Sequence, residues 1–561
     1  MCFTSQHKAI NQKEYGKAVS PLRYDSLALI LSCSIFVVYG KQSEKNKYIC
    51  SSKRHSALHT FWDTTRSNDL AYIHTADDLD ELLIGSCYLS VAPTTPRKYE
   101  SYYFSYLQYM ADETEELIGN TRYNPEANIR PRVFGYYTWQ QHVGDAFDGL
   151  KSYKESIDWL RVYNHILTLN IVLDEAERID TPTVADQNRI KRIKAEAHFL
   201  RAAYYFQLVN LYALPYAPEN LDKPGVPLKE SHFIEKKKFT RATISEVYAL
   251  ISNDLSLAIK EIEGQPTRSL YRISEAGVIL FASRVALYMQ DWQRAEEYAS
   301  KALSLHPTLY NLNALGVDSY FFSVDNPELI FSMGGGLVCA EMGSSSPIGG
   351  FSVSKELYQL YNKDDLRGTR FIERIKVKGA QPNGYQLRAC KTTPKLMGKS
   401  EVSDVFVLRS AEIYLNLAEA LAMQGKSAEA VQLLKQLHQN RYKVGAALPD
   451  IDTSPKGLIN EIRKERRMEL CFESQRWFDI RRYRVQSQSP EKIELTHTYT
   501  IYKKEGRNSF PDITYFYTLP ANEDEGYVLP LPREERTFND IIQDNPRIER
   551  KPTKIIQHET K

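Results

Sequence analysis

Five aromatic side chains in two short stretches have the chemistry to bind a sugar. One stretch, "FGYYTWQQH", contains Tyr136, Tyr137 and Trp139, and the other contains Tyr320 and Phe321. A flat aromatic ring stacks on the apolar face of a sugar ring, and polar side chains around it add hydrogen bonds. We therefore predict that these five residues contact a ligand. Core packing is the alternative interpretation for each of them.

The chain offers no arrangement of residues that is typical of catalysis or metal binding. The motifs G-x-S-x-G, H-E-x-x-H and G-x-x-x-x-G-K-[ST] are absent, and the twelve histidines lack the spacing of metal ligands. Acidic pairs such as Asp77–Asp78 and Glu115–Glu116 could hydrolyse a glycoside only at a separation that sequence does not show. Solvated helix faces are the simpler interpretation of these pairs. We expect no catalytic residue, no metal and no cofactor.

The stretch "RKERRMELCFESQRWFDIRRYR" (463–484) is more than half charged, yet it contains several large apolar side chains. On a helical wheel four charged residues lie within the apolar arc, namely Arg466, Glu469, Glu473 and Arg476. Four others lie opposite, namely Arg463, Lys464, Arg467 and Arg481. Because a buried charge must be paired, the first four predict a structural ion-pair network, with partners at i,i+3. A helix that binds DNA would instead place its basic residues away from the apolar face.

The overall composition also argues against nucleic acid as a partner. The chain has 561 residues, with 72 basic against 70 acidic side chains and a formal net charge of +2. Binding to a phosphate backbone depends on a basic excess, which is missing here. The seven cysteines fall at irregular spacings without C-x-x-C, so neither a disulfide framework nor a zinc site is indicated.

The amino-terminal region has the pattern of an export signal. Basic residues up to Arg23 precede the apolar run "SLALILSCSIFVVYG", which is too short to span a bilayer comfortably but suits a signal peptide. We predict an export signal region at 1–40 and a polar tether at 41–70. The segment "ILSC" has the form of a lipoprotein cleavage box, which makes Cys33 a candidate lipid anchor. The alternative is an ordinary signal peptide in which Cys33 occurs by chance.

Helical periodicity dominates the chain from residue 153 onward. Four stretches carry small and large apolar residues at helical spacing, namely 162–179, 195–216, 275–307 and 411–441. The last two look like tetratricopeptide units of two helices each, in which alanines let the helices approach closely. The segments 332–354 and 485–540 lack this period. The pattern predicts a mainly α fold: a tetratricopeptide-like scaffold of helix pairs with an irregular, loop-rich second lobe.

Four segments in order resemble the SusD/RagB family of outer-membrane nutrient-uptake lipoproteins. They are "KAEAHFLRAAYYFQLVNLYALPY", "LRSAEIYLNLAEALA", "RKERRMELCFESQRWFDIRRY" and "YVLPLPREE…DNP". The resemblance implies a SusD-like amino-terminal region at 71–330 and a carboxy-terminal SusD/RagB region at 331–561. The ending departs from the family's Asn-Pro-Gly-Tyr: Asn545 and Pro546 match, whereas Arg547 and Ile548 do not.

The same resemblance implies a function without catalysis. A family member sits lipid-anchored on the outer face of the outer membrane. There it captures an oligosaccharide or another nutrient for a TonB-dependent, SusC-like transporter. Two other functions remain open from the residues alone. One is a tetratricopeptide scaffold that binds proteins inside the cell, and the other is a glycoside hydrolase.

Overall fold

The computed structural model describes residues 73–89, 103–122, 124–125, 129–150, 155–335, 338, 342, 348–382, 384–392 and 401–559. The predicted export region 1–40, the tether 41–70 and Cys33 lie outside these ranges. Among the residues described, no helix is both long enough and apolar enough to cross a bilayer.

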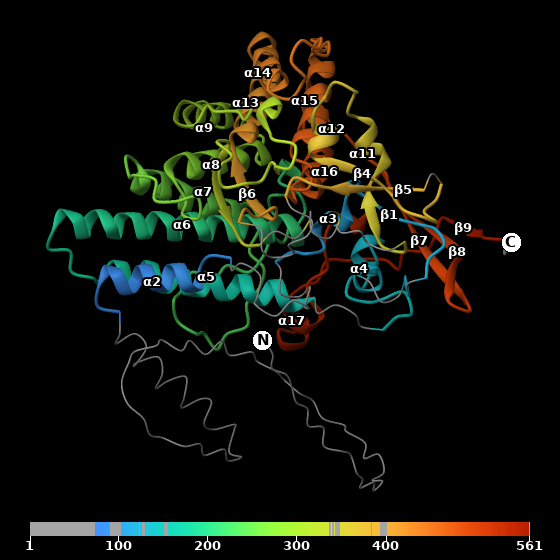
Figure 1. The fold of residues 1–561 in the computed structure, drawn as a ribbon. Helices are drawn as coiled ribbons and strands as arrows, with labels where there is room; N and C mark the ends of the chain where they lie inside the picture. The colour runs from blue at the N-terminus through green and yellow to red at the C-terminus, as the bar shows by residue number, and fades with distance from the viewer. Residues whose placement is uncertain are drawn as a thin grey trace, which may run out of the picture. The chain divides into compact units, whose positions relative to one another are not determined.

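Helices make up most of the regular structure, so the predicted mainly α fold is confirmed (Figure 1). The helices of the described part are α2 (Ala76–Ser86), α3 (Leu107–Met110), α4 (Arg130–Tyr137), α5 (Ser156–Ala176), α6 (Val184–Tyr212), α7 (Ile244–Ile262), α8 (Glu275–Tyr288), α9 (Trp292–Leu305), α11 (Lys355–Gln359), α12 (Arg367–Arg370), α13 (Ser410–Met423), α14 (Ser427–Gln439), α15 (Pro455–Glu469), α16 (Arg476–Arg484) and α17 (Arg533–Phe538).

Local sequence determines where several of these helices begin and how they pair. Thr75, Thr183 and Thr243 each accept a hydrogen bond from the backbone of the third helical residue, whose carboxylate bonds back to the threonine. The α8–α9 and α13–α14 units are the two predicted helix pairs, and α9 packs against α13. The alanines predicted at these helix contacts are all buried, namely Ala282, Ala286, Ala295, Ala299 and Ala302.

The described part also contains antiparallel strands, which the sequence analysis did not predict. They are β1 (Thr114–Glu116), β2 (Leu329–Met333), β3 (Phe351–Val353), β4 (Ile372–Lys376), β5 (Tyr385–Ala389), β6 (Phe406–Arg409), β7 (Leu495–Glu505), β8 (Asn508–Leu519) and β9 (Lys554–Gln557). Their pairings are β1–β3, β2–β6, β4–β5 and the three-stranded β7–β8–β9. Because β1 comes from the region 71–330 and β3 from the region 331–561, the two parts of the sequence interlock.

The stretch 463–484 forms two helices rather than the single predicted one. Helix α15 ends at Glu469, and α16 begins at Arg476. Between them the backbone reverses, with positive φ at Phe472 (64°) and Ser474 (57°), a conformation that L-residues rarely adopt. A helical wheel assumes one continuous axis, so it could not give the directions of the side chains beyond Glu469.

Glu469 and Glu473 lie in a buried charge network, as predicted, but their partners come from distant segments. Glu469 accepts hydrogen bonds from Arg409 at 2.7 Å and from Arg367 and Arg441 at 2.9 Å each. Glu473 accepts from the ammonium of Lys391 at 2.6 Å and from Arg409 at 2.7 Å. Burial alone would raise the pKa of Glu469, but the three arginines outweigh it and hold that pKa well below its ordinary value. Helices α12 and α15 and strand β6 are therefore joined through buried charges.

The predicted i,i+3 ion pairs are wrong. Arg466 pairs instead with Asp479 at 2.9 Å, and Arg476 forms a two-pronged pair with Asp112 at 2.8 Å. The face expected to be exposed is also partly buried. Arg463 and Arg481 are buried and donate to backbone carbonyls, and Arg467 pairs with Asp112 at 3.1 Å. Of the four residues predicted opposite the apolar arc, Lys464 is exposed.

Glu113 is a buried carboxyl beside this network. It lies between α3 and β1, and its Oε2 accepts the backbone N–H of Phe472 at 3.3 Å. Its Oε1 has no hydrogen-bond partner among the described residues. Burial, together with the adjacent carboxylate of Asp112, raises the pKa of Glu113 to about 7, although Arg476 and Lys391 oppose the shift.

The raised pKa makes stability depend on pH. Because the pKa of Glu113 is higher in the folded chain than its ordinary 4.5, its stabilising effect is complete below pH 4.5 and is lost as pH rises through 7. Glu113→Gln, which stays neutral, should therefore exceed the wild type by about 3 kcal/mol in free energy of unfolding at pH 8 and match it near pH 4. Denaturant unfolding at both pH values measures this.

A control is Glu115→Gln, at the partly exposed neighbour, which should follow the wild type. If Glu113→Gln exceeded the wild type by the same free energy of unfolding at both pH values, the raised pKa of Glu113 would be contradicted.

Candidate functional site

The aromatic residues predicted between 136 and 139 are buried, so an exposed binding surface at these positions is wrong. Tyr137 and Trp139 each stack on the imidazole of His497, with ring centroids 4.2 Å and 4.4 Å apart. Tyr136 stacks on Tyr106 at 4.0 Å. The Trp139 side chain is 1% exposed, and its indole N–H donates to the carbonyl of Met110 at 3.0 Å. Tyr137 and Trp139 thus pack against β7 of the β7–β8 hairpin, which follows about 360 residues later in the chain.

Of the second predicted pair, Phe321 lies in the core and Tyr320 lies partly at the surface. Phe321 is fully buried and packs on Phe371, with centroids 4.9 Å apart. The guanidinium groups of Arg409 and Arg441 lie 5.3 Å and 5.8 Å from its ring, so Phe321 covers the buried charge network. Tyr320 is half-buried and remains a proposed ligand contact.

A series of ring contacts leads from Phe134, which is buried on α4, to the surface. Phe134 on α4 meets Tyr499, Tyr517 and Phe147 edge-on at 4.8, 5.7 and 5.4 Å. Phe147 lies nearly parallel to Tyr499 at 5.3 Å and contacts Tyr515 at 5.2 Å. Phe147 is 37% exposed and Tyr515 is half-buried. The sequence analysis missed both residues, although the Thr/Tyr alternation around a Glu-Gly turn at 496–517 is typical of a hairpin.

A tight turn holds Phe147 outward. The backbone N–H of Ala146 donates to the carbonyl of Leu150 at 2.8 Å, and Gly149 adopts φ +78°, which favours glycine. Asp148 accepts the N–H of Leu150 at 3.0 Å through Oδ1, and its side chain is exposed. The turn therefore presents an aromatic ring and a carboxylate next to each other at the surface.

Buried charges fix the strand beneath this ring. The guanidinium carbon of Arg130 lies 4.3 Å from the centroid of Tyr499, and its Nη1 pairs with Glu116 at 3.0 Å. Glu116 also accepts the backbone N–H and the hydroxyl of Thr500 at 3.0 Å and 2.8 Å. Tyr499 thus has little freedom to move, and it supports Phe147 from below. Ile555 on β9 pairs with Tyr515 across the strands and is exposed.

We call Phe147, Asp148, Tyr515 and Ile555 the Phe147 surface. Its chemistry suits binding rather than reaction. The rings offer an apolar stacking face, and the carboxylate accepts hydrogen bonds from hydroxyl groups. Asp145, the preceding carboxylate in the same loop, is paired with Arg533 at 2.6 Å.

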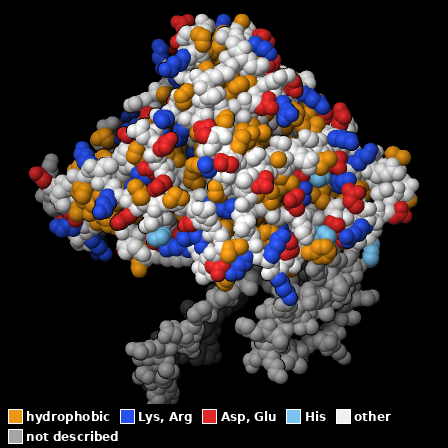
Figure 2. All heavy atoms as spheres, turned by 180° about the vertical axis from the view of Figure 1, so that it is seen from behind, with side chains coloured by type: hydrophobic (Ala, Val, Ile, Leu, Met, Phe, Trp, Pro, Cys, Tyr) orange, Lys and Arg blue, Asp and Glu red, His pale blue; other side chains and the backbone are white. Residues whose placement is uncertain are grey.

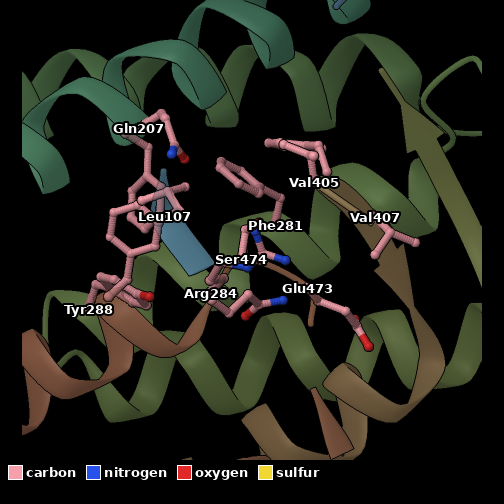
Figure 3. Close-up of a pocket in the computed structure, with 13 residues that line it drawn as sticks. Leu107, Gln207, Phe281, Arg284, Tyr288, Val405, Val407, Glu473 and Ser474 are labelled. Atoms are coloured by element: carbon pink, nitrogen blue, oxygen red, sulfur yellow. The ribbon is translucent and has the colours of Figure 1, made fainter. Parts of the chain in front are cut away.

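An internal cavity of about 30 Å³ is too small for a sugar ring. Leu107 from α3, Phe281 and Arg284 from α8, and Ser474 from the turn before α16 line it (Figure 3). A volume of this size holds one or two water molecules, whereas small-molecule sites are typically hundreds of cubic ångströms. On the outside, basic and acidic side chains of the described residues are interspersed over the face shown in Figure 2, without a broad field of one sign. The outer Phe147 surface is therefore the better candidate.

Two family models match this chain. One, described as "SusD family", matches residues 376–547, and the other, described as "Starch-binding associating with outer membrane", matches residues 88–287. The "SusD-like protein P2" of Formosa agariphila is 25% identical over 433 residues, which cover 69% of this chain and 79% of that protein.

Solved structures share the fold. A SusD superfamily protein from Bacteroides thetaiotaomicron has a TM-score of 0.64 and 21% identity, over 84% of this chain and 100% of that one. A SusD-like carbohydrate binding protein from Bacteroides vulgatus has a TM-score of 0.60 and 20% identity, over 84% of this chain and 98% of that one. At these identities the likeness concerns the fold alone.

Proposed function

Because the chain belongs to the SusD/RagB family, we propose that it is a non-catalytic, glycan-binding protein of the outer-membrane surface. It passes the captured oligosaccharide to a TonB-dependent, SusC-like transporter, as the family resemblance implies. Cys33 is the proposed lipid anchor that holds it on the extracellular face.

The Phe147 surface is the observation that supports glycan binding most strongly. Phe147 is exposed, and it rests on a rigid stack of Tyr499 and Phe134. Because its ring is already held in place, ligand binding costs little side-chain entropy. Sugar rings stack on such faces, while Asp148 accepts hydrogen bonds from ring hydroxyls. We propose that one sugar unit rests on Phe147 and that neighbouring units extend toward Tyr515 and Ile555.

Phe147→Ala should weaken glycan binding about tenfold or more, because it removes the stacking face. The melting temperature should change little, since the ring is partly exposed. A glycan-array screen of the wild type would identify the best ligand, and calorimetric titration of the variant against that ligand would measure the loss.

The matched control is Tyr271→Ala, which removes an exposed aromatic ring elsewhere on the chain. It should leave the affinity unchanged. Equal affinity of Phe147→Ala and the wild type would remove the Phe147 surface as the binding site, and failure of every glycan on the array would contradict the glycan ligand itself.

A further inference from the structure

Four large exposed apolar side chains lie on two segments that the proposed glycan site does not use. Phe233 and Ile234 lie in the loop between α6 and α7, and Phe538 and Ile541 lie at and after the end of α17. Each of the four is at least half exposed. We call them the Phe233–Phe538 patch.

The two segments that carry the patch are bonded to each other. The ammonium of Lys238 pairs with Asp540 at 2.5 Å, and the side-chain amide of Asn539 donates to the carbonyl of Phe239 at 2.8 Å. Figure 1 shows the loop below α5 next to α17, in agreement with these contacts. The two segments that carry the four apolar side chains are therefore neighbours, which matters because apolar residues scattered singly need no explanation.

The loop holds its apolar tip outward in a defined conformation. Asn170 on α5 donates to the carbonyl of Lys229 at 2.8 Å, and the N–H of Phe233 donates to the hydroxyl of Ser231 at 3.0 Å. The ammonium of Lys229 bonds to Glu235 at 2.6 Å and to the carbonyl of Phe233, which closes the loop on itself. Phe233 is thus presented to solvent by a folded loop.

Basic side chains lie beside this tip in the sequence, and some of them are ion-paired: Lys237 with Glu235 at 2.7 Å and Lys238 with Asp540 at 2.5 Å. The segment 229–241 contains five lysines and arginines and two glutamates, and Lys236, Lys237 and Lys238 are consecutive and exposed. Aromatic and aliphatic tips beside lysines are typical of surfaces that insert shallowly into an anionic lipid interface. There the apolar groups enter the headgroup region and the lysines meet the phosphates.

We propose that the Phe233–Phe538 patch docks on an anionic lipid surface, an inference that rests on the proposed location at the outer membrane. Helix α2 is the first helix of the described part, and both α2 and α17 pack against α5. A chain anchored ahead of α2 would then be held to the lipid at a second place. One lipid chain alone binds only marginally, so a second contact of this kind strengthens membrane attachment.

The test measures binding of the full chain carrying Cys33→Ala, which has no lipid, to vesicles. Sedimentation should recover the protein with phosphatidylcholine vesicles that contain phosphatidylglycerol, and less of it at high salt. Phe233→Ser combined with Phe538→Ser should lower the partition coefficient about tenfold, and so should Lys236→Glu combined with Lys237→Glu.

The control combines Val317→Ser with Val444→Ser, two highly exposed apolar residues elsewhere, and should bind like the parent. No vesicle binding by the parent, equal binding to pure phosphatidylcholine, or an equal loss in the control would overturn the proposal. Self-association abolished by the patch variants would assign the patch to a protein interface instead. Because glycan affinity is measured in solution without vesicles, failure here is distinguishable from failure of the proposed function.

Discussion

Glu469→Ala should lower the free energy of unfolding by about 3–5 kcal/mol, because it breaks a buried charge network. The variant leaves three buried guanidinium groups, those of Arg367, Arg409 and Arg441, without their shared carboxylate. Glu328 and Asp365 still pair with these arginines, but neither reaches all three. Denaturant unfolding at neutral pH would measure the change.

The control for this variant is Lys464→Ala on the same helix. Lys464 is exposed and makes a loose i,i+3 pair with Glu461 at 3.6 Å, so its loss should stay within about 0.5 kcal/mol. Arg467, which the helical wheel placed on the exposed face, is unsuitable because it pairs with Asp112 and Glu356. Similar stabilities of Glu469→Ala and Lys464→Ala would contradict the buried network.

Trp139→Ala should also destabilise the chain strongly, by about 3–5 kcal/mol. It removes a buried indole that stacks on His497 and donates to Met110, and it leaves a cavity at the base of the ring stack. Burial lowers the pKa of His497 to about 4, so its ring is neutral at pH 7. No charge in the stack therefore compensates for the loss of the Trp139 indole.

Thermal and denaturant unfolding would show the loss, with Tyr271→Ala as the exposed-ring control. Glycan affinity measured well below the melting temperature should be less affected by Trp139→Ala than by Phe147→Ala. A Trp139 variant of unchanged stability and lost affinity would return the binding site to the positions first predicted from sequence.

Local information was enough to predict most of the helical scaffold. The alanines of α8 and α9 act within one or two helical turns, so their spacing alone reveals the helix pair. The charged stretch also predicted that Glu469 and Glu473 are buried. Their partners could not be predicted, because Arg409 and Arg367 lie about 60 and 100 residues earlier and approach only in the folded chain.

The candidate site was harder to predict for the same reason. Trp139 and Phe147 are both aromatic and lie eight residues apart, so residue type cannot distinguish them. A distant hairpin covers Trp139, whereas a turn holds Phe147 outward. The difference arises from the contact of Trp139 with His497 and those of Phe147 with Tyr499 and Tyr515. A hairpin prediction for 495–519 would have supplied part of this information, but the position of that hairpin against α4 is a tertiary contact.

The most direct test of the glycan-binding account is a crystal structure of the chain with the best array ligand bound. The account predicts electron density for a sugar ring stacked on Phe147 and extending toward Tyr515, with a hydroxyl hydrogen-bonded to Asp148 and with Trp139 still buried against His497. Density for the ligand at any surface that excludes Phe147 and Tyr515 would contradict it.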